Sequence, residues 1–504
     1  MKIRAFNPGF PSVKKIGFVL GPLLAILLFV FFNPDSSTPQ VGFMAGIALL
    51  MAIWWITESV PLAVTALIPV ALFPLFGIMD GKDVSTLYFN HVIFLFLGGF
   101  MVALAMEKWN LHKRIALFTL LIFGTKPTRI MLGFMIATAF LSMWISNTAT
   151  AMMMVPIALS LIINLEETLG KEKVGKYSIG LLLGIAYSAS IGGIATLVGT
   201  PPNLSFARIF SITFPDAPEI SFANWFFFAL PISVFFLLLV WLLLSFIFCR
   251  GAFKIDKSAI RKQFQELGKM GFEEKVVLSI FCSLVILWLT RADIQFGSFV
   301  IPGWSELFPN ADYINDGTVA IALALFLFII PDRNNARILD WSTASRLPWN
   351  IVLLFGGGFA LAGGFLESGL SDWFGVQMSG LESFSPVMLV GSICFVITFL
   401  TELTSNTATA EMILPILAAL GKAIGRNPLL LMVPATLASS FAFMMPVATP
   451  PNAILFGTKR LKIMDMAKVG IIINILGIII LTIGIILLGP LLGIDMNEMP
   501  EWAK

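Results

Sequence analysis

The residues with the clearest capacity for chemistry in this chain form one short polar motif that occurs twice, each time inside an apolar segment. Ser146-Asn147-Thr148 is repeated 259 positions later as Ser405-Asn406-Thr407. Polar groups left unsatisfied in hydrocarbon cost several kcal/mol each, so small polar residues at such a depth indicate a binding site. Their hydroxyl and amide groups can bind an anion or coordinate a small cation.

A second duplicated element follows each motif. It reads Gly199-Thr200-Pro201-Pro202-Asn203 in the first half and Ala448-Thr449-Pro450-Pro451-Asn452 in the second. Two consecutive prolines remove two backbone donors and clash with the preceding turn, so each element predicts a break in a helix. A break at membrane depth exposes carbonyl groups at one helix end and N–H groups at the other, and it is tolerated where it is buried in protein or lines a cavity.

These groups suit an anion flanked by small cations. Ser and Asn can cap a following helix, whose N-terminus then favours negative charge, and Thr148 and Thr407 add hydroxyl donors. Neither motif contains Lys or Arg, so the charge of the anion must be balanced in another way. Unwound carbonyls with Asn and Ser/Thr oxygens can coordinate Na⁺. Ser142 and Thr401, one helical turn before the motifs, could reach the same ions. We therefore expect two symmetry-related cation sites beside one anion site.

Composition identifies the elements that must position these residues as membrane helices. The chain has 504 residues, of which 58% are hydrophobic and 12% charged, about half the charged fraction typical of soluble domains. Its formal net charge of +3 is too small to suggest nucleic-acid binding. We find no recognisable nucleophile–base pair, His–carboxylate pair or phosphate loop, so we predict that the chain is not an enzyme.

We predict an all-α polytopic membrane protein with about eleven transmembrane helices, including one at 61–78, plus two re-entrant hairpins. The hairpins are predicted at about 127–165 and 386–424, where a straight helix would be about 58 Å long, nearly twice the thickness of the hydrocarbon core. Counting each as no crossing, with the N-terminus in the cytoplasm, puts most loop Lys and Arg on the inner side. The same count turns one half upside down relative to the other, as in the inverted repeats of secondary transporters.

This topology divides the chain into consecutive parts. An N-terminal first span at 1–40 precedes the first repeat at 41–249, with its hairpin and a broken helix at about 177–210. A cytoplasmic connector at 250–272 leads to the second repeat at 273–490. That repeat contains the second hairpin and a broken helix at about 428–458, and a tail follows at 491–504.

Two acidic residues near the second motif have no counterparts in the first. Glu402 and Glu411 correspond to Met143 and Met152, so we exclude them from the symmetric site and expect structural hydrogen bonds for them. The glycines at 98–99 and 356–358 are expected to allow close packing of helices.

At these motifs the sequence resembles the divalent anion/Na⁺ symporter family, which includes dicarboxylate and citrate carriers. The likeness rests on both Ser-Asn-Thr motifs, both Thr-Pro-Pro-Asn breaks and the stretch Trp54–Pro61, and it covers nearly the whole chain. It implies an elevator-type transporter that works as a homodimer. It also implies one Na⁺ near Ser142, Ser146, Asn147 and Gly199, and a second near Thr401, Thr404, Asn406 and Ala448. The substrate carboxylates would contact Asn147, Thr148, Ser405, Asn406, Thr407, Thr449 and Pro450.

We therefore predict Na⁺-coupled symport of C4-type dicarboxylates such as succinate, malate or fumarate across the plasma membrane. In a cell with two membranes, this is the inner membrane. The alternatives are a Na⁺-independent dicarboxylate exchanger, a carrier of sulfate or citrate, and an anion channel. The expected partners are the substrate, the lipid bilayer and a second copy of the chain, with no nucleic acid.

Overall fold

The computed structural model describes residues 13–34, 38–249, 255–296, 299–496 and 498–504, and this part of the chain is almost entirely helical. Its only strands are β1 (Ile294–Phe296) and β2 (Phe299–Ile301), which pair in an antiparallel hairpin. The prediction of a helical architecture is confirmed, with this short hairpin as the one addition.

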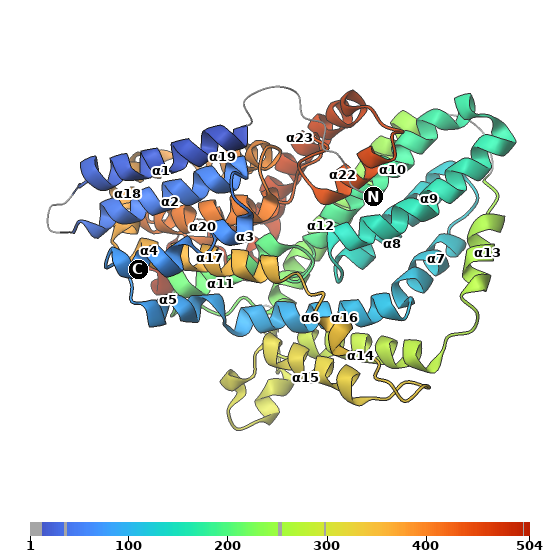
Figure 1. Cartoon of the computed structure of the whole chain (residues 1–504), viewed down its shortest axis with the longest axis horizontal. Helices are drawn as coiled ribbons and strands as arrows, with labels where there is room; N and C mark the ends of the chain where they lie inside the picture. The colour runs from blue at the N-terminus through green and yellow to red at the C-terminus, as the bar shows by residue number, and fades with distance from the viewer. Residues whose placement is uncertain (1–12, 35–37, 250–254, 297–298, 497) are drawn as a thin grey trace.

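The helices of the first half include long apolar helices and short connecting ones (Figure 1). In chain order they are α1 (Val13–Phe31), α2 (Gln40–Thr57), α3 (Leu62–Thr65), α4 (Ile68–Leu75), α5 (Gly81–Tyr88), α6 (His91–Lys108), α7 (Leu111–Ile122), α8 (Pro127–Ser142), α9 (Asn147–Leu169), α10 (Lys171–Gly193), α11 (Pro201–Thr213), α12 (Phe222–Phe248) and α13 (Ser258–Glu266).

The second half adds ten α-helices and five single turns of 3₁₀ helix. In chain order the elements are α14 (Phe272–Leu289), η1 (Trp304–Leu307), η2 (Ala311–Tyr313), α15 (Asp316–Ile329), α16 (Trp341–Ala344), α17 (Trp349–Glu367), α18 (Leu370–Met378), η3 (Ser379–Ser383), α19 (Pro386–Thr401), α20 (Asn406–Ala423), α21 (Leu429–Ala438), α22 (Pro450–Gly457), α23 (Ile463–Leu488), η4 (Gly489–Leu492) and η5 (Glu501–Ala503).

Eight helical segments in the described part of the chain are long and apolar enough to cross a membrane. Five shorter apolar helices accompany them, among them α8 and α19. Many large apolar side chains on these helices face outward, including Phe246 and Leu487, which are 71% and 70% exposed. An outward apolar surface of this extent is what lipid contact requires, so the chain is a multi-pass membrane protein.

The segment 61–78, where we predicted one span, contains an apolar helical stretch, Leu62–Leu75, that is divided into two short helices. Helix α3 ends at Thr65 and α4 begins at Ile68. Pro69 has no N–H to donate to the Thr65 carbonyl, which explains the interruption. The freed backbone is used by neighbours, because the Tyr88 hydroxyl donates to the Ala66 carbonyl and Gly357 of α17 packs against Ala66.

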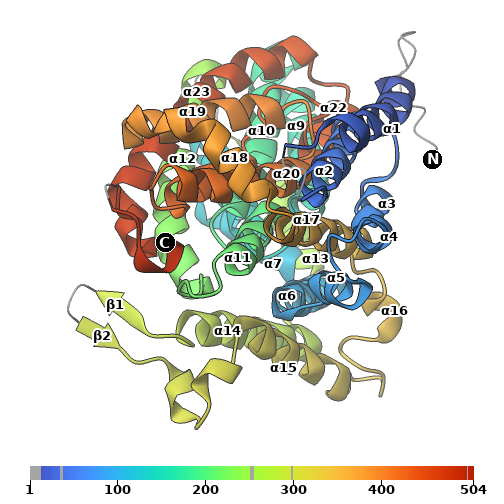
Figure 2. The same cartoon turned by 90° about the vertical axis from the view of Figure 1, so that its left-hand side faces the viewer.

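Gly98 brings helices into close contact, as expected from the sequence, and so does Gly364, which we did not predict. A Cβ added at Gly98 of α6 would lie 2.6 Å from the backbone of Ala320 in α15, and one at Gly364 of α17 would lie 2.5 Å from the Phe73 ring. Figures 1 and 2 show the result for α6, with α14 and α15 lying along it on one edge of the molecule.

Each of the four helices that begin at the duplicated motifs packs against a helix from the other half of the chain. Helix α9 of the first half packs against α22 of the second, and α20 of the second half packs against α11 of the first. In Figure 1, α11 and α20 lie left of the centre, and α9 and α22 lie right of it. This packing brings the N-termini of all four helices toward one region.

Candidate binding site

The first motif forms a turn between two helices. Helix α8 ends at Ser142, and α9 begins at Asn147 after the N-cap residue Ser146. The Ser146 hydroxyl accepts a hydrogen bond from the Ala149 N–H at 3.2 Å, and the Ser142 hydroxyl donates to the Asn147 side-chain oxygen at 2.5 Å. The motif thus presents the N-terminus of a 23-residue helix, and Ser142 and Asn147 are in direct contact.

The second motif repeats this arrangement with one difference. Helix α19 ends at Thr401, α20 begins at Asn406, and the Thr401 hydroxyl lies 2.9 Å from the Asn406 side-chain oxygen and 2.7 Å from the Ser439 carbonyl oxygen. Ser405 occupies the N-cap position but its side chain makes no capping bond, unlike that of Ser146. The Ser405 oxygen therefore accepts no bond from its own helix, whereas the Ser146 oxygen accepts one and keeps its proton to donate.

Each Thr-Pro-Pro-Asn element begins a helix after an unwound segment. Helix α10 ends at Gly193 and α11 begins at Pro201, while α21 ends at Ala438 and α22 begins at Pro450. Thr200 and Thr449 are the extended N-cap residues. Proline fits the first helical positions, whose N–H groups have no partner inside the helix.

The asparagine of each element braces its unwound segment, a role that we did not predict. Asn203 donates to the carbonyls of Gly193 at 3.4 Å and Thr196 at 2.7 Å. Asn452 donates to those of Ala442 at 3.0 Å and Met445 at 3.1 Å. In both halves acceptors lie ten and seven residues before the asparagine, and Asn203 also lies 3.2 Å from the Ile194 carbonyl oxygen. The two segments therefore share one internal geometry as well as one sequence motif.

Replacing Asn203 by alanine is expected to destabilise the protein by about 2 kcal/mol, because buried carbonyl groups would lose their donor. Thermal unfolding of purified protein in detergent measures this effect. Asn164→Ala is the matched control, since the Asn164 side chain on α9 makes no hydrogen bond to another described residue. Equal unfolding temperatures for the two variants would contradict the brace.

The two turns and the two breaks line a single cavity of about 800 Å³. Every residue predicted to bind the substrate lies in its wall, as do most of those predicted to bind Na⁺. From the duplicated elements the wall contains Ser146, Asn147, Thr148, Gly199, Thr200, Pro201, Thr404, Ser405, Asn406, Thr407, Ala448, Thr449 and Pro450. Ser142 and Thr401 are fully buried and contact Asn147 and Asn406 from behind.

The described wall of this cavity contains no Lys or Arg, and its charged residues are Glu58 and Glu402. An anion bound there would contact hydroxyls, amides and helix N-termini, whose partial positive charge is favourable but small. A dianion bound there would have no basic side chain of the described wall beside it. The surroundings of both turns are instead rich in oxygen atoms, which suit a cation.

Backbone oxygens converge at the predicted first cation site. A Cβ added at Gly199 would overlap the Gly193 carbonyl oxygen and lie 3.0 Å from the Ser142 carbonyl oxygen. The Asn147 side-chain oxygen lies 2.7 Å from a Cβ added at Gly193, and the Gly199 carbonyl oxygen lies 3.2 Å from it. Carbonyl and amide oxygens gathered around an unwound segment are the usual ligands of Na⁺ in transporters, so the residues present fit this ion.

The predicted second cation site is similar except at Thr404. The Thr404 hydroxyl donates to the Leu400 carbonyl at 3.0 Å and contacts the Thr409 hydroxyl at 2.5 Å, so it is held against its own helix ends. Thr401 and Asn406 contact each other as Ser142 and Asn147 do. Ala448 stands where the first element has Gly199.

Glu402 holds the second break in place through its carboxylate. One oxygen accepts from the N–H groups of Phe443 at 2.7 Å and Met444 at 2.8 Å and from the Asn474 amide at 2.8 Å. The other accepts from the Met445 N–H at 3.0 Å. The expectation of a structural hydrogen bond is confirmed, but the carboxylate makes four. Its hydrogen bonds hold residues 443–445 in the segment that leads to Ala448.

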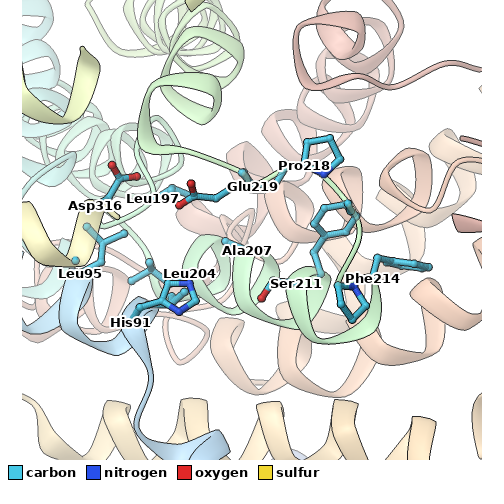
Figure 3. A pocket seen from close by; sticks show the side chains of 16 residues that line it. His91, Leu95, Leu197, Leu204, Ala207, Ser211, Phe214, Pro218, Glu219 and Asp316 are labelled. Atoms are coloured by element: carbon cyan, nitrogen blue, oxygen red, sulfur yellow. The ribbon is translucent and has the colours of Figure 1, made fainter. Parts of the chain in front are cut away.

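Another cavity, of about 200 Å³, contains none of the predicted site residues (Figure 3). It lies between α11 and the start of α6, and His91, Glu219 and Asp316 face it. The Asp316 carboxylate is already paired with Arg291 at 2.5 Å and accepts from the Phe222 N–H at 2.8 Å. These contacts join α12, α15 and the segment that follows α14, so we assign this cluster a structural role.

Comparison with known proteins places this geometry in a family. The family model for the sodium:sulfate symporter transmembrane region matches residues 17–494. The chain belongs to the sodium:sulfate symporter family. Membership confirms the resemblance to divalent anion/Na⁺ symporters, and it confirms that this chain is a transporter and not an enzyme.

Several relatives in this family are similar over nearly their whole length. A protein of Staphylococcus saprophyticus, named sodium-dependent dicarboxylate transporter SdcS, is 45% identical, covering 98% of this chain and 95% of the relative. The protein of the same name from Staphylococcus aureus is 43% identical, covering 97% and 94%.

Solved structures with the same general fold are more distant in sequence. Neisseria gonorrhoeae MtrF, described as illuminating a class of antimetabolite efflux pumps, has a TM-score of 0.57 and 14% identity, covering 94% of this chain and 95% of its own. The Alcanivorax borkumensis YdaH transporter has a TM-score of 0.56 and 12% identity, covering 96% and 98%. At these identities the likeness concerns the fold of this family member and not its substrate.

Proposed function

We propose that this family member carries C4-type dicarboxylates, such as succinate, malate or fumarate, into the cell together with Na⁺. The observation that carries this proposal is the convergence of both Ser-Asn-Thr turns and both Thr-Pro-Pro breaks on one cavity without basic residues. The names of the relatives at 45% and 43% identity support both the ion and the substrate class.

The duplicated geometry favours a substrate with two anionic ends. Helices α9 and α20 come from opposite halves, and each begins at the cavity with an Asn-Thr pair. One carboxylate would contact Asn147 and Thr148, and the other would contact Asn406 and Thr407, with Ser405, Thr449 and Pro450 completing the wall. Sulfate concentrates its charge on one centre and cannot contact both helix starts as fully.

The cations would occupy the oxygen-rich turns on either side of this anion. We assign the first Na⁺ to Ser142, Ser146, Asn147 and Gly199, and the second to Thr401, Thr404, Asn406 and Ala448. Because Asn147 and Asn406 belong to a cation set and also face the substrate, Na⁺ binding would orient their side chains before the anion arrives. This order of binding couples the two solutes.

Transport would follow the design that the family resemblance implies. The hairpins and broken helices would move together across the membrane against a scaffold in a homodimer. The two halves would act as inverted repeats with re-entrant hairpins at 127–165 and 386–424. The N-terminus would lie in the cytoplasm of a cell whose plasma membrane, or inner membrane, holds the carrier.

Uptake of labelled succinate into proteoliposomes tests the proposal. An inward Na⁺ gradient should accelerate uptake, and replacing Na⁺ by K⁺ should remove the acceleration, because K⁺ is too large for shells built around Na⁺. Excess unlabelled malate or fumarate should compete.

Uptake that is equal without Na⁺ but requires internal dicarboxylate would instead identify an exchanger. Competition by sulfate or citrate but not by malate would assign one of those anions as substrate. Conductance without Na⁺-dependent accumulation would identify a channel.

A further inference from the structure

Glu411 is a buried acidic residue that the binding site does not use. It lies in α20, its side chain is fully buried, and no ion pair within the described residues includes it. An ionised carboxylate in such surroundings would be very unfavourable, since burying an unpaired charge costs far more than burying a neutral group.

The contacts of the two carboxyl oxygens differ. Oε1 lies 2.5 Å from the Ser205 hydroxyl of α11, whereas Oε2 has no hydrogen-bond partner and lies against Gly358 of α17. Any side chain at position 358 would collide with the carboxyl group. Three helices thus enclose the group, with a single polar neighbour.

The single proton of the Ser205 hydroxyl bears on the state of this carboxyl. The Ser205 hydroxyl also lies 3.2 Å from the Pro201 carbonyl oxygen, to which it can donate. A serine hydroxyl has one proton and two lone pairs, so it cannot donate to both oxygens. Both contacts are hydrogen bonds at once only when Glu411 carries a proton and donates it to Ser205, which donates in turn to Pro201.

Charged side chains on the neighbouring helices do not alter this conclusion. On α11, Arg208 donates to the Ser211 hydroxyl at 3.2 Å and not to Glu411. Lys422 of α20 and Glu367 of α17 stand about 16 Å and 14 Å along their helices from positions 411 and 358, at 1.5 Å per residue. Asp372 of α18 belongs to a helix that packs on the far end of α20, where Gly375 meets Ala423. Helices α2 and α21 contain no charged residue.

We propose that Glu411 is a proton-binding site, which holds its proton at neutral pH and joins the second hairpin arm to the first broken helix. The proton links α20 to the Pro201 carbonyl, next to Thr200 in the wall of the binding cavity. Loss of this proton at alkaline pH places a negative charge between α11, α17 and α20 and weakens their packing. This inference does not depend on which anion is carried.

Infrared difference spectra of the purified protein test the protonation state directly. The wild type minus Glu411→Gln spectrum at neutral pH should contain the carbonyl stretch of a protonated carboxylic acid, and D₂O should shift it. Ser205→Ala should also shift this band, since the acceptor of the proton is removed. Absence of the band, or a band that Ser205→Ala leaves unmoved, would overturn the proposal. Neither of these infrared measurements requires transport. A negative result for the proton site is therefore distinguishable from failure of the dicarboxylate assignment.

Thermal unfolding against pH provides a second test. The folded protein keeps a proton that the unfolded chain releases, so raising the pH favours the unfolded state of the wild type. Glutamine keeps the shape and the donor of the neutral acid but does not ionise. Glu411→Gln should therefore unfold at a higher temperature relative to the wild type as the pH rises, and it should retain Na⁺-driven uptake. A constant difference across pH, or loss of uptake in a folded variant, would contradict the proton site.

Discussion

Replacing Glu402 by glutamine is expected to lower uptake about tenfold or more and to lower the unfolding temperature, because the break before Ala448 loses its anchor. Hydrogen bonds to charged groups each contribute about 1.5–3 kcal/mol, and the Glu402 carboxylate accepts four. The amide that replaces one oxygen would direct its own hydrogens toward the Met445 N–H. Succinate uptake in proteoliposomes and thermal unfolding in detergent measure the two effects.

Glu411→Gln is the matched control for this experiment. It makes the same chemical change nine residues away in the same hairpin, at a carboxyl that we assign as neutral. We expect Glu402→Gln to lose most of its succinate uptake and Glu411→Gln to retain it. Equal behaviour of the two variants would show that the number of donors around a carboxyl does not distinguish these positions.

Replacing Gly199 by alanine is expected to weaken Na⁺ activation of uptake by about 10- to 100-fold, which corresponds to an overpacking cost of about 1–3 kcal/mol. The added methyl would overlap the Gly193 carbonyl oxygen and press on that of Ser142, so the oxygens of the first cation site would move apart. The Na⁺ concentration that gives half-maximal uptake is the quantity to measure.

Gly175→Ala serves as the control in the same half of the molecule. Gly175 lies within α10, and nothing lies within 4 Å of a Cβ added there. Alanine should therefore be neutral or slightly stabilising, since it favours helix over glycine by about 1 kcal/mol. Unchanged Na⁺ dependence in Gly199→Ala would exclude this glycine from the cation site.

The positions of the site residues were accessible to sequence reasoning because the motifs are local and occur twice. Each Ser-Asn-Thr motif begins a helix, and each Pro-Pro pair begins another, so residues within a few positions determine the geometry. The residues predicted for the substrate accordingly share one cavity wall. The repetition added long-range information, since two copies of one element imply related places in the fold.

The contacts that support the site were not accessible in the same way. Glu402 binds N–H groups 41 to 43 residues further along the chain, and Ser205 meets Glu411 across 206 residues. No local pattern marks such partners, and neither acid has a counterpart in the first half. The interruption after Thr65 did have a local signal in Pro69, which we did not weigh against the strong apolar character of 61–78.

The asparagine braces of the two unwound segments have a mechanical consequence. The side chains of Asn203 and Asn452 each donate to carbonyls ten and seven residues earlier, so both unwound segments resist bending. Any displacement that exposes the cavity to the other side of the membrane must then occur in connecting segments outside these two unwound segments. Probes placed on α10 and α11 should keep a constant separation while their distance to the surrounding helices changes.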